Sequence, residues 1–471
     1  MKSRASLWLG AIILLATAVR LSVGFVFFGF LTGDDVEILQ AGFLRALGWP
    51  YQPWEIRNLL VSDLLAAPAI ALAAALGVSS TRVLAWSASL PFVVLASLNV
   101  WLVHRLALDW LRDERPALLA AGLYAFHWLP LGYGSMVYPR TASTTCVLLA
   151  TLALWKGRPS LWRPLLAGGL MAVAWAIRFS EAVFLLPLLA LAWRQEDRMR
   201  GEGLRERVVR CGALAAGFAA VSLLTIGVED WLTWGRPFAS LAAFVHYSLV
   251  EGRTSSLAAQ PWYLYLRRLP NWLPLTLLPF LWRARKVRGS LVLALYVLLP
   301  LLMLSLIQQK QLRYLQGSIP FLILLAAAGA WSLWEAGRRR WVAALAALSL
   351  LLELYGMGFL TRKSMAAVEA AQQLAALPSP PRAICLSQAW AYGGTLYLGR
   401  DTGIRELPFP LSEPALGDEV LAACPWIAFY EEDHRRDPRI AERLAQQGYA
   451  RLGAWRWGRS RPVLVFRRPN S

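Results

Sequence analysis

The sequence predicts an all-α polytopic membrane protein with a small C-terminal α/β domain. Of its 471 residues, 57% are hydrophobic and only 16% are charged, whereas soluble domains carry roughly 25% charged residues. The apolar residues form long runs, and arginine and lysine gather in short clusters between them, as in cytoplasmic loops. From residue 361 onward, polar residues mix with short β-type segments. We therefore divide the chain into a transmembrane domain, 1–360, and a C-terminal domain, 361–471.

The formal net charge is +19, from 48 Lys and Arg against 29 Asp and Glu. A surplus of this size also occurs in nucleic-acid-binding proteins. Here the basic residues lie in clusters between apolar runs, so we expect membrane lipids with anionic headgroups as partners and no nucleic acid. This distribution is typical of a multi-pass protein of the inner (plasma) membrane.

The first apolar run extends from Leu7 to Phe30, behind the basic residues Lys2 and Arg4. It resembles a secretion signal, but it exceeds the ~20 residues that span a bilayer, and no small-x-small cleavage site closes it. We expect an uncleaved first helix whose N-terminus is cytoplasmic. The loop that follows it then lies on the outer face.

A second apolar segment, Leu59–Leu76, is interrupted by Asp63 and Pro68. If it crossed the membrane, the dense basic clusters downstream would move to the outer face, against the positive-inside bias. We therefore expect interfacial helices in this first outer loop, and about eleven transmembrane helices in total. The ten later spans are predicted over Val83–Val103, Pro116–Ser135, Thr141–Trp155, Leu165–Ile177, Ala182–Trp193, Cys211–Val228, Trp272–Leu281, Ser290–Ile307, Leu315–Trp334 and Trp341–Leu360.

With this topology the basic loops Lys156–Arg163, Arg194–Arg210 and Arg283–Arg288 are cytoplasmic, and the C-terminal domain is extracytoplasmic. The short runs, such as Leu165–Ile177 and Trp272–Leu281, indicate tilted or broken helices.

The C-terminal domain is predicted from three β-type runs, AICLS, WIAFY and PVLVFRR, with an amphipathic helix over Pro438–Gln447. Its length of roughly 100 residues is normal for a domain. It contains Cys385 and Cys424, which either pair or remain thiols, because sequence alone does not place two α-carbons within the ~7 Å that a disulfide requires.

The first outer loop opens with three acids in four positions: Asp34, Asp35 and Glu37. A carboxylate cluster at the end of a membrane segment is costly to desolvate, so it either extends into water or has a catalytic role. We interpret it as an acidic catalytic centre on the outer face.

The same topology brings further polar side chains to the outer face, where each short turn contributes one or two basic side chains. Arginine suits a phosphate because its planar fork donates two parallel charged hydrogen bonds. An anionic lipid headgroup is therefore expected beside the acids. The candidates are Glu55, Arg57, Tyr138, Arg140, Arg178, Glu181, Asp230, His246, Lys310 and Arg313.

Each candidate also has a simpler interpretation. Arg140 and Arg178 could be interface anchors that extend to water, and Glu181 could only neutralise Arg178. The two aspartates could cap a helix, and His246 could simply pack at the interface. With four histidines and no close His/Cys/acid grouping, we expect no zinc site; no metal is assigned, and a cation at the paired acids is left as an open alternative. No phosphate-binding G-x-x-x-x-G-K-[ST] loop or G-x-S-x-G nucleophile motif is present.

Five stretches in chain order carry a family resemblance. They are Gly33-Asp34-Asp35 with Gln40 and Pro53-Trp54-Glu55-Ile56-Arg57, then Tyr138-Pro139-Arg140-Thr141, Ala176-Ile177-Arg178-Phe179-Ser180-Glu181, Asp230 to Pro270, and Gln309-Lys310-Gln311-Leu312-Arg313-Tyr314. Together they resemble the motifs of a membrane-embedded C-type (GT-C) glycosyltransferase, nearest to the mannosyltransferases that build GPI anchors and lipid-linked glycans. The departures are Gly33 in place of the histidine before the acid, and Gln309-Lys310-Gln311 in place of His-Lys-Glu.

The resemblance implies an inverting transfer of a mannose-like sugar on the extracytoplasmic face. The donor is a polyprenyl-phosphate sugar, and the acceptor is a lipid-linked glycan, a glycolipid or a protein. A carboxylate can accept the proton of the acceptor hydroxyl, and the resemblance favours Asp34 over Asp35. Arg178, Arg313 and Lys310 would bind the phosphate, with Arg140 in support, and no cofactor is required.

A transporter or flippase of an anionic lipid-linked sugar is the main alternative. It would place polar residues near the middle of the membrane and give two halves of matching hydropathy. Neither pattern is evident here. The C-terminal domain either recognises the acceptor or covers the site.

Overall fold

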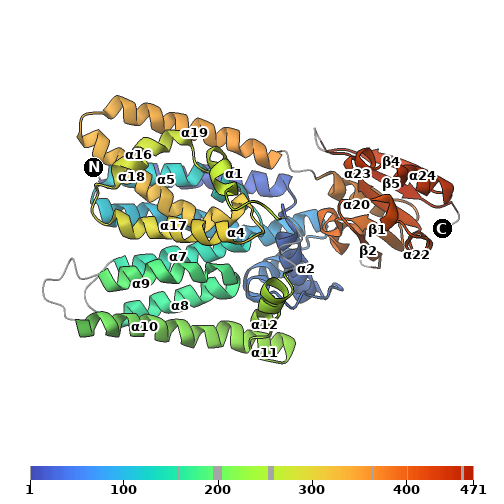
Figure 1. The fold of residues 1–471 in the computed structure, drawn as a ribbon, viewed down its shortest axis with the longest axis horizontal. Coiled ribbons are helices and arrows are strands. Elements are labelled where there is room, and N and C mark those ends of the chain that lie inside the picture. Colours follow the sequence, from blue (N-terminus) through green and yellow to red (C-terminus); the bar gives the residue numbers. More distant parts are fainter. Residues whose placement is uncertain are drawn as a thin grey trace.

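The computed structural model describes residues 2–155, 160–194, 204–252, 259–361, 365–399, 401–457 and 461–469. The predicted cytoplasmic loops Lys156–Arg163 and Arg194–Arg210 lie partly outside these residues. Figure 1 shows long helices lying side by side in a bundle, with a unit of strands and short helices at one end.

The first half of the bundle places two long helices against shorter ones. Their bounds are α1 (Lys2–Val26), α4 (Thr81–Leu111), α5 (Glu114–Phe126), α6 (Trp128–Tyr133), α7 (Pro139–Trp155), α8 (Trp162–Ile177), η2 (Phe179–Phe184) and α9 (Leu185–Arg194). The second half contains α10 (Leu204–Ser222), η4 (Leu223–Val228), α11 (Glu229–Trp234), α12 (Ala239–Val245), η5 (His246–Val250), α14 (Leu264–Arg267), α15 (Leu269–Trp272), η6 (Leu275–Leu277), α16 (Leu278–Ala284), α17 (Ser290–Leu306), η7 (Leu312–Ser318), α18 (Ile319–Glu335) and α19 (Arg339–Thr361).

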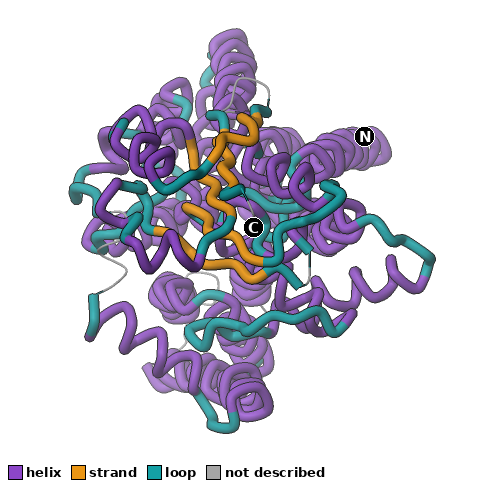
Figure 2. Tube along the Cα trace, turned by 90° about the vertical axis from the view of Figure 1, so that its right-hand side faces the viewer, coloured by secondary structure: helices purple, strands orange, loops and turns teal. Residues whose placement is uncertain are grey.

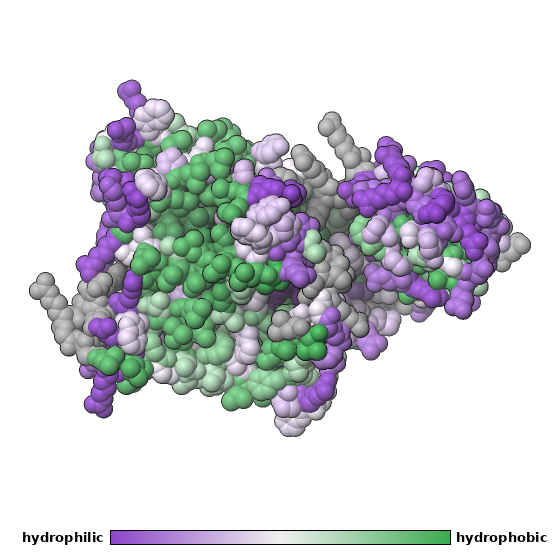
Figure 3. All heavy atoms as spheres, viewed as in Figure 1, coloured by the Kyte–Doolittle hydropathy of each residue, from purple (hydrophilic) through white to green (hydrophobic). Residues whose placement is uncertain are grey.

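Within the described residues, five helical segments are long and apolar enough to cross a membrane: Arg4–Val26, Thr81–Leu111, Leu204–Trp234, Leu312–Glu335 and Arg339–Gly358. Figure 3 shows hydrophobic side chains covering the bundle, with hydrophilic ones at its left edge and over the C-terminal unit. The expected polytopic helical membrane fold is confirmed. The number of eleven spans stays a prediction, because several helices, such as α8 with 16 residues, are shorter.

The loop after α1 begins with α2 (Gly33–Leu47), whose N-cap is Thr32 in an extended conformation. The helix ends at Gly48, which has φ 66°, a left-handed conformation that glycine adopts without strain. The apolar segment predicted to be interfacial becomes η1 (Ser62–Ala66) and α3 (Ala67–Ala75). These 14 residues extend about 21 Å, less than the ~30 Å hydrocarbon core. They pack against α2 and α4.

The two ends of the bundle differ in what they carry. The N-terminus lies at the end away from the strands, whereas α2, α11 and α12 lie toward them (Figure 1). The outer-loop elements predicted from the sequence therefore gather at the same end as the C-terminal unit.

The C-terminal unit contains a five-stranded sheet of order β2-β1-β3-β5-β4, seen in front of the helices in Figure 2. Strand β1 pairs in parallel with β2 and β3, whereas β5 pairs antiparallel with β3 and β4. The three predicted β runs are strands, and α24 occupies the predicted amphipathic segment. The bounds are α20 (Ala366–Ala375), β1 (Ala383–Ser387), η8 (Ala389–Tyr392), α21 (Thr395–Leu398), β2 (Gly403–Leu407), η9 (Glu413–Ala415), α22 (Asp418–Ala423), β3 (Trp426–Tyr430), α23 (Glu431–Arg436), α24 (Arg439–Gln446), β4 (Ala450–Trp455) and β5 (Val463–Arg467).

A disulfide joins Cys385 of β1 to Cys424, which directly follows α22, with α-carbons 5.6 Å apart. Both cysteines are buried. This resolves the alternative that the sequence left open in favour of pairing.

Candidate active site

Asp34 stands at the centre of a cluster of charged side chains from distant parts of the chain. Its Oδ1 pairs with Arg57. Its Oδ2 lies 3.3 Å from Nη1 of Arg178 and 3.3 Å from Nη2 of Arg313. Glu37, one helical turn after Asp34, lies 3.2 Å from Nε of Arg57. We call these five residues the arginine–aspartate cluster.

Each member of the cluster lies at an element end on the same side of the bundle. Asp34 and Glu37 occupy the first turn of α2, and Arg57 follows in the same loop. Arg178 is the C-cap of α8, and Arg313 lies in η7, between α17 and α18. Four separate segments of the chain thus converge at one end of the bundle.

The electrostatics of the cluster favour an ionised Asp34. Burial acts to raise the pKa of Asp34, but the nearby Arg57, Arg178 and Arg313 outweigh it and hold that pKa well below the usual carboxyl range. Burial likewise raises the pKa of Glu37, against the attraction of Arg57. Three guanidinium groups face two carboxylates, so the cluster has a surplus of one positive charge when all five groups are ionised.

Asp35 has a different role from Asp34. Its side chain is fully buried, and its Oδ2 accepts hydrogen bonds from the backbone N–H groups of Leu31 at 2.7 Å and Thr32 at 3.0 Å. It therefore fixes the start of α2, as an acid three positions after an N-cap does. Burial raises the pKa of Asp35 to about 7.

A second buried pair borders the cluster. Arg140 of α7 pairs with Glu181 of η2, and its Nη2 donates to Oγ of Ser180 at 3.0 Å. Its guanidinium lies 5.1 Å from the ring centroid of Tyr314. Tyr138 is buried, with its ring 5.8 Å from the guanidinium of Arg313. The pair is neutral overall, and it joins α7 to the turn that carries Arg178.

A cavity of about 300 Å³ opens beside these residues. Its lining combines the basic side chains of Arg57, Arg140 and Arg178, with Asn58 and Tyr314, and apolar side chains from η2, α12 and the C-terminal end of α17: Phe179, Phe244, Met303, Leu304 and Ile307. A separate void of about 30 Å³ is lined by Asp34 and Glu37, and Arg57 and Arg178 line both spaces. These two arginines therefore connect the acids to the larger cavity.

Four predicted residues lie apart from the cluster. Lys310 donates from Nζ to the carbonyl oxygens of Gln260 and Ile307. Asp230 is buried and accepts from N and Oγ of Ser240. Glu55 pairs with Arg236 at the surface, and His246, with its side chain 63% exposed, pairs with Glu251. The structure does not bring these four to Asp34.

Among the cavity residues that the sequence-based candidates did not include, two are polar and directly adjacent in sequence to a predicted arginine: Asn58 and Tyr314. Tyr314 was recognised only as part of a motif, although it directly follows Arg313. Asn58, next to Arg57, donates from Nδ2 to the carbonyl of Thr225 at 3.1 Å, and it lines both cavities. Only their adjacency to the predicted arginines marked these residues in the sequence.

The C-terminal unit contacts α2 directly through the segment 389–398. A Cβ atom at Gly33 would lie 3.5 Å from the indole of Trp390, so this ring packs over the residue before Asp34. Nε2 of Gln40 donates to Oγ1 of Thr395 at 3.4 Å. Gly394 has φ 57° and ψ −136°, a backbone conformation that favours glycine, and Nε2 of Gln40 lies 2.2 Å from where its Cβ would be.

The arrangement suits a reaction in which negative charge moves between a carboxylate and a phosphate. An ionised carboxylate beside an arginine that lines the cavity can accept a proton, and the guanidinium groups can stabilise phosphate charge. The apolar side chains of the lining suit a hydrocarbon chain attached to that phosphate.

A family model covers most of the chain: residues 46–398 match the Alg9-like mannosyltransferase family. No curated protein matches the chain by sequence.

Solved structures share the fold at low sequence identity. ArnT from Cupriavidus metallidurans bound to undecaprenyl phosphate is 15% identical, with a TM-score of 0.61, and the match covers 96% of this chain and 97% of that one. An Archaeoglobus fulgidus oligosaccharyltransferase tethered with an acceptor peptide is 12% identical, with a TM-score of 0.55 and coverage of 92% and 72%. AglB from the same organism, in complex with an inhibitory peptide and a dolichol-phosphate, has 12% identity, a TM-score of 0.52 and coverage of 94% and 72%.

Proposed function

Because this chain belongs to the Alg9-like mannosyltransferase family and is a membrane-embedded glycosyltransferase of the GT-C type, we propose that it transfers a mannose-like sugar from a polyprenyl-phosphate donor with inversion. The acceptor is a hydroxyl of a lipid-linked glycan, a glycolipid or a protein. The reaction takes place on the extracytoplasmic face of the inner membrane.

One observation carries the donor assignment. Arg57, Arg140 and Arg178 line a cavity whose lining also includes the apolar side chains of Phe244, Met303 and Leu304. A polyprenyl phosphate has these two characters, an anionic head and a hydrocarbon tail. The phosphodiester of the donor has one negative charge, which matches the single positive surplus of the arginine–aspartate cluster. The similar ArnT structure was solved bound to undecaprenyl phosphate, which supports the same class of ligand here.

The chemistry follows from this placement. The acceptor oxygen attacks the anomeric carbon opposite the phosphate, forming a new C–O bond while the sugar–phosphate C–O bond breaks with its electron pair. Asp34 accepts the hydroxyl proton, and the polyprenyl phosphate leaves with one additional negative charge. Negative charge thus disappears from Asp34 as it increases on the phosphate. Arg178 and Arg313 lie beside Asp34, which carries the negative charge before the transfer. Arg178 also borders the cavity that holds the phosphate, which carries this charge afterwards.

Donor binding also changes the pKa of the proton acceptor, Asp34. In the free enzyme, the arginines hold the pKa of Asp34 well below the usual range, which makes it a weak base. A bound phosphate competes for Arg178 and Arg313, so their attraction for Asp34 weakens and its pKa rises. Asp34 becomes an effective proton acceptor when the donor is in place.

The acceptor would approach from the side of the C-terminal unit. Trp390 packs over Gly33, and the residue remains 37% exposed. An indole face next to the base is a suitable surface for the apolar face of a sugar ring. The disulfide between Cys385 and Cys424 supports an oxidising, extracytoplasmic location for this unit.

The test is sugar transfer in membranes supplied with labelled polyprenyl-phosphate sugars, comparing wild type with Asp34→Asn. The substitution removes the proton acceptor while keeping its size, so we expect the rate to fall by about 10²–10⁴-fold. Asp63→Asn is the matched control, because Asp63 pairs with the partly exposed Arg45 outside the cavity, and it should retain activity. Full transfer by Asp34→Asn at normal expression would refute the assignment, and donor export without transfer would favour a transporter.

A further inference from the structure

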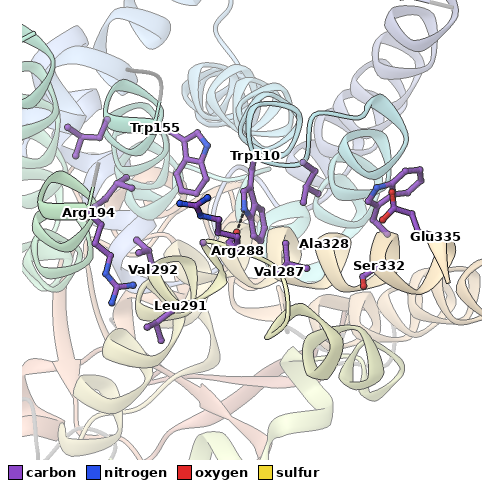
Figure 4. A pocket seen from close by; sticks show the side chains of 15 residues that line it. Trp110, Trp155, Arg194, Val287, Arg288, Leu291, Val292, Ala328, Ser332 and Glu335 are labelled. Atoms are coloured by element: carbon purple, nitrogen blue, oxygen red, sulfur yellow. Dashed lines mark hydrogen bonds between the residues drawn. The ribbon is translucent and has the colours of Figure 1, made fainter. Parts of the chain in front are cut away.

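A second cavity lies at the opposite end of the bundle from the arginine–aspartate cluster. It measures about 530 Å³, within the range of small-molecule sites. The side chains that line it come from the ends of α4, α7, α9 and α18 and from the turn that begins α17 (Figure 4). Nothing in the proposed transfer reaction uses this cavity.

The lining combines aromatic and basic side chains. Three indoles contribute to it, Trp110, Trp155 and Trp331, together with the guanidinium groups of Arg194 and Arg288. Glu335 is the one acid among the side chains that line it. A third arginine borders the cavity indirectly, because Nε of Arg283 donates to Oγ of the lining residue Ser332 at 3.0 Å.

The structure holds part of this lining in a fixed geometry. Nε1 of Trp110 donates to the carbonyl oxygen of Arg288 at 2.8 Å (Figure 4), and its ring meets that of Trp155 edge to face with centroids 6.2 Å apart. Gly289 has φ +88°, and a Cβ there would lie 3.2 Å from Nε1 of Trp110. The indole thus fixes the turn that carries Arg288, which makes the cavity a shaped feature of the fold.

The position of the cavity indicates its ligand. It lies where apolar helices end. The basic cluster Arg283–Arg288 contributes to its lining, and the cluster Arg338–Arg340 follows shortly after the lining residue Glu335 in the sequence. Tryptophan is enriched at this level of a membrane, and basic pockets between transmembrane helices on the cytoplasmic side suit anionic lipid headgroups. The lining includes the apolar side chains of Leu154, Leu191 and Ala328, so it also accommodates hydrocarbon.

We propose that this cavity binds an anionic phospholipid of the cytoplasmic leaflet. Arg194 and Arg288 pair with the phosphate of its headgroup. The indoles contact its glycerol region, and the first carbons of an acyl chain lie against the apolar side chains of the lining. The site is separate from the donor cavity, at the other end of the bundle.

The test uses the full chain in phosphatidylcholine vesicles that contain a photoreactive phosphatidylglycerol, with the labelled residues mapped by mass spectrometry. We expect adducts on the segments of Trp110, Trp155 and Trp331. A photoreactive phosphatidylcholine at the same density should label them far less. Excess inorganic phosphate at constant ionic strength should leave the labelling unchanged, since the site requires the lipid and not the free anion.

The variant Arg194→Gln/Arg288→Gln removes the two cavity charges. Each basic residue contributes about fivefold to the binding of an anionic headgroup, so labelling of these segments should fall roughly 25-fold. Arg338→Gln/Arg340→Gln removes the same charge from exposed positions at the same end, and it should change this labelling by less than about threefold. Equal labelling by the two lipids, displacement by phosphate, or equal losses in the two variants would each overturn the proposal. The comparison of the two lipids on wild type tests it without any substitution.

Discussion

Replacing Arg313 by Gln provides a direct test of how the arginines act. Its guanidinium lies 3.3 Å from Asp34, and the side chain is only 9% exposed. We propose that it also pairs with the donor phosphate, and at an effective dielectric constant of about 20 two unit charges about 4 Å apart interact by roughly 4 kcal/mol. Losing an attraction of this size should reduce kcat/KM by about 10²–10³-fold.

The loss should be divided unequally between kcat and KM. In the bound complex Asp34 and the phosphodiester are both anionic, and the reaction only shifts charge from one to the other. Arg313 pairs with Asp34, and we propose that it also pairs with the phosphate, so it stabilises the bound complex and the transition state to similar extents. Uniform stabilisation of this kind affects KM more than kcat.

The measurement is steady-state transfer at varied donor concentration in membranes of equal enzyme content. Arg313→Lys keeps the charge but loses the planar fork, so it should recover part of the loss. Arg236→Gln is the matched control, because Arg236 is 67% exposed and pairs with Glu55 at the surface. A value of kcat/KM within about threefold of wild type, or a loss confined to kcat, would refute the reasoning.

Three further predictions concern stability. Arg140→Gln leaves Glu181 buried without its partner and should destabilise the protein by about 3–5 kcal/mol. The double variant Arg140→Gln/Glu181→Gln should recover much of that lost stability. Thermal unfolding in detergent measures both variants, and equal unfolding temperatures for the single and the double variant would contradict the prediction. Burial raises the pKa of Asp35 to about 7 from 3.8, so its protonated form is favoured on folding and its contribution to stability is lost as the pH rises from about 4 to about 7. The difference in unfolding temperature between wild type and Asp35→Asn should therefore shift against wild type as the pH rises through this window. A difference that stays constant with pH would exclude the effect. The disulfide closes a loop between residues 39 positions apart, so Cys385→Ser/Cys424→Ser should cost about 4 kcal/mol, and a reducing agent should lower the unfolding temperature of wild type but not of this variant.

The sequence predicted which side chains share one end of the bundle, because hydropathy and basic clusters determine the side on which each turn emerges. Asp34, Arg57, Arg178 and Arg313 were all assigned to one face on that basis. The distinction between Asp34 and Asp35 depends on the residue at which α2 begins, since successive residues on a helix point about 100° apart. Thr32, three positions before Asp35, was the available signal for a capping role.

The remaining differences come from side-chain reach and from weak patterns. Lys310 was assigned to the phosphate, but its flexible side chain reaches two backbone carbonyls instead. Strands β2 and β4 were not predicted because they lie at the sheet edges and are mostly exposed, so neither has a continuous apolar run. The contact between Trp390 and Gly33 joins residues far apart in sequence, which no local pattern indicates.

The hydrogen bond between Gln40 and Thr395 joins residues 355 positions apart, and this separation has a consequence for biosynthesis. The ribosome makes α2 among the first fifty residues, but the segment that covers it emerges only after the last membrane helix. Throughout the intervening elongation, α2 lacks the cover of the segment 389–398. A message truncated just after α19 would therefore yield an inserted bundle in which α2 lacks this cover.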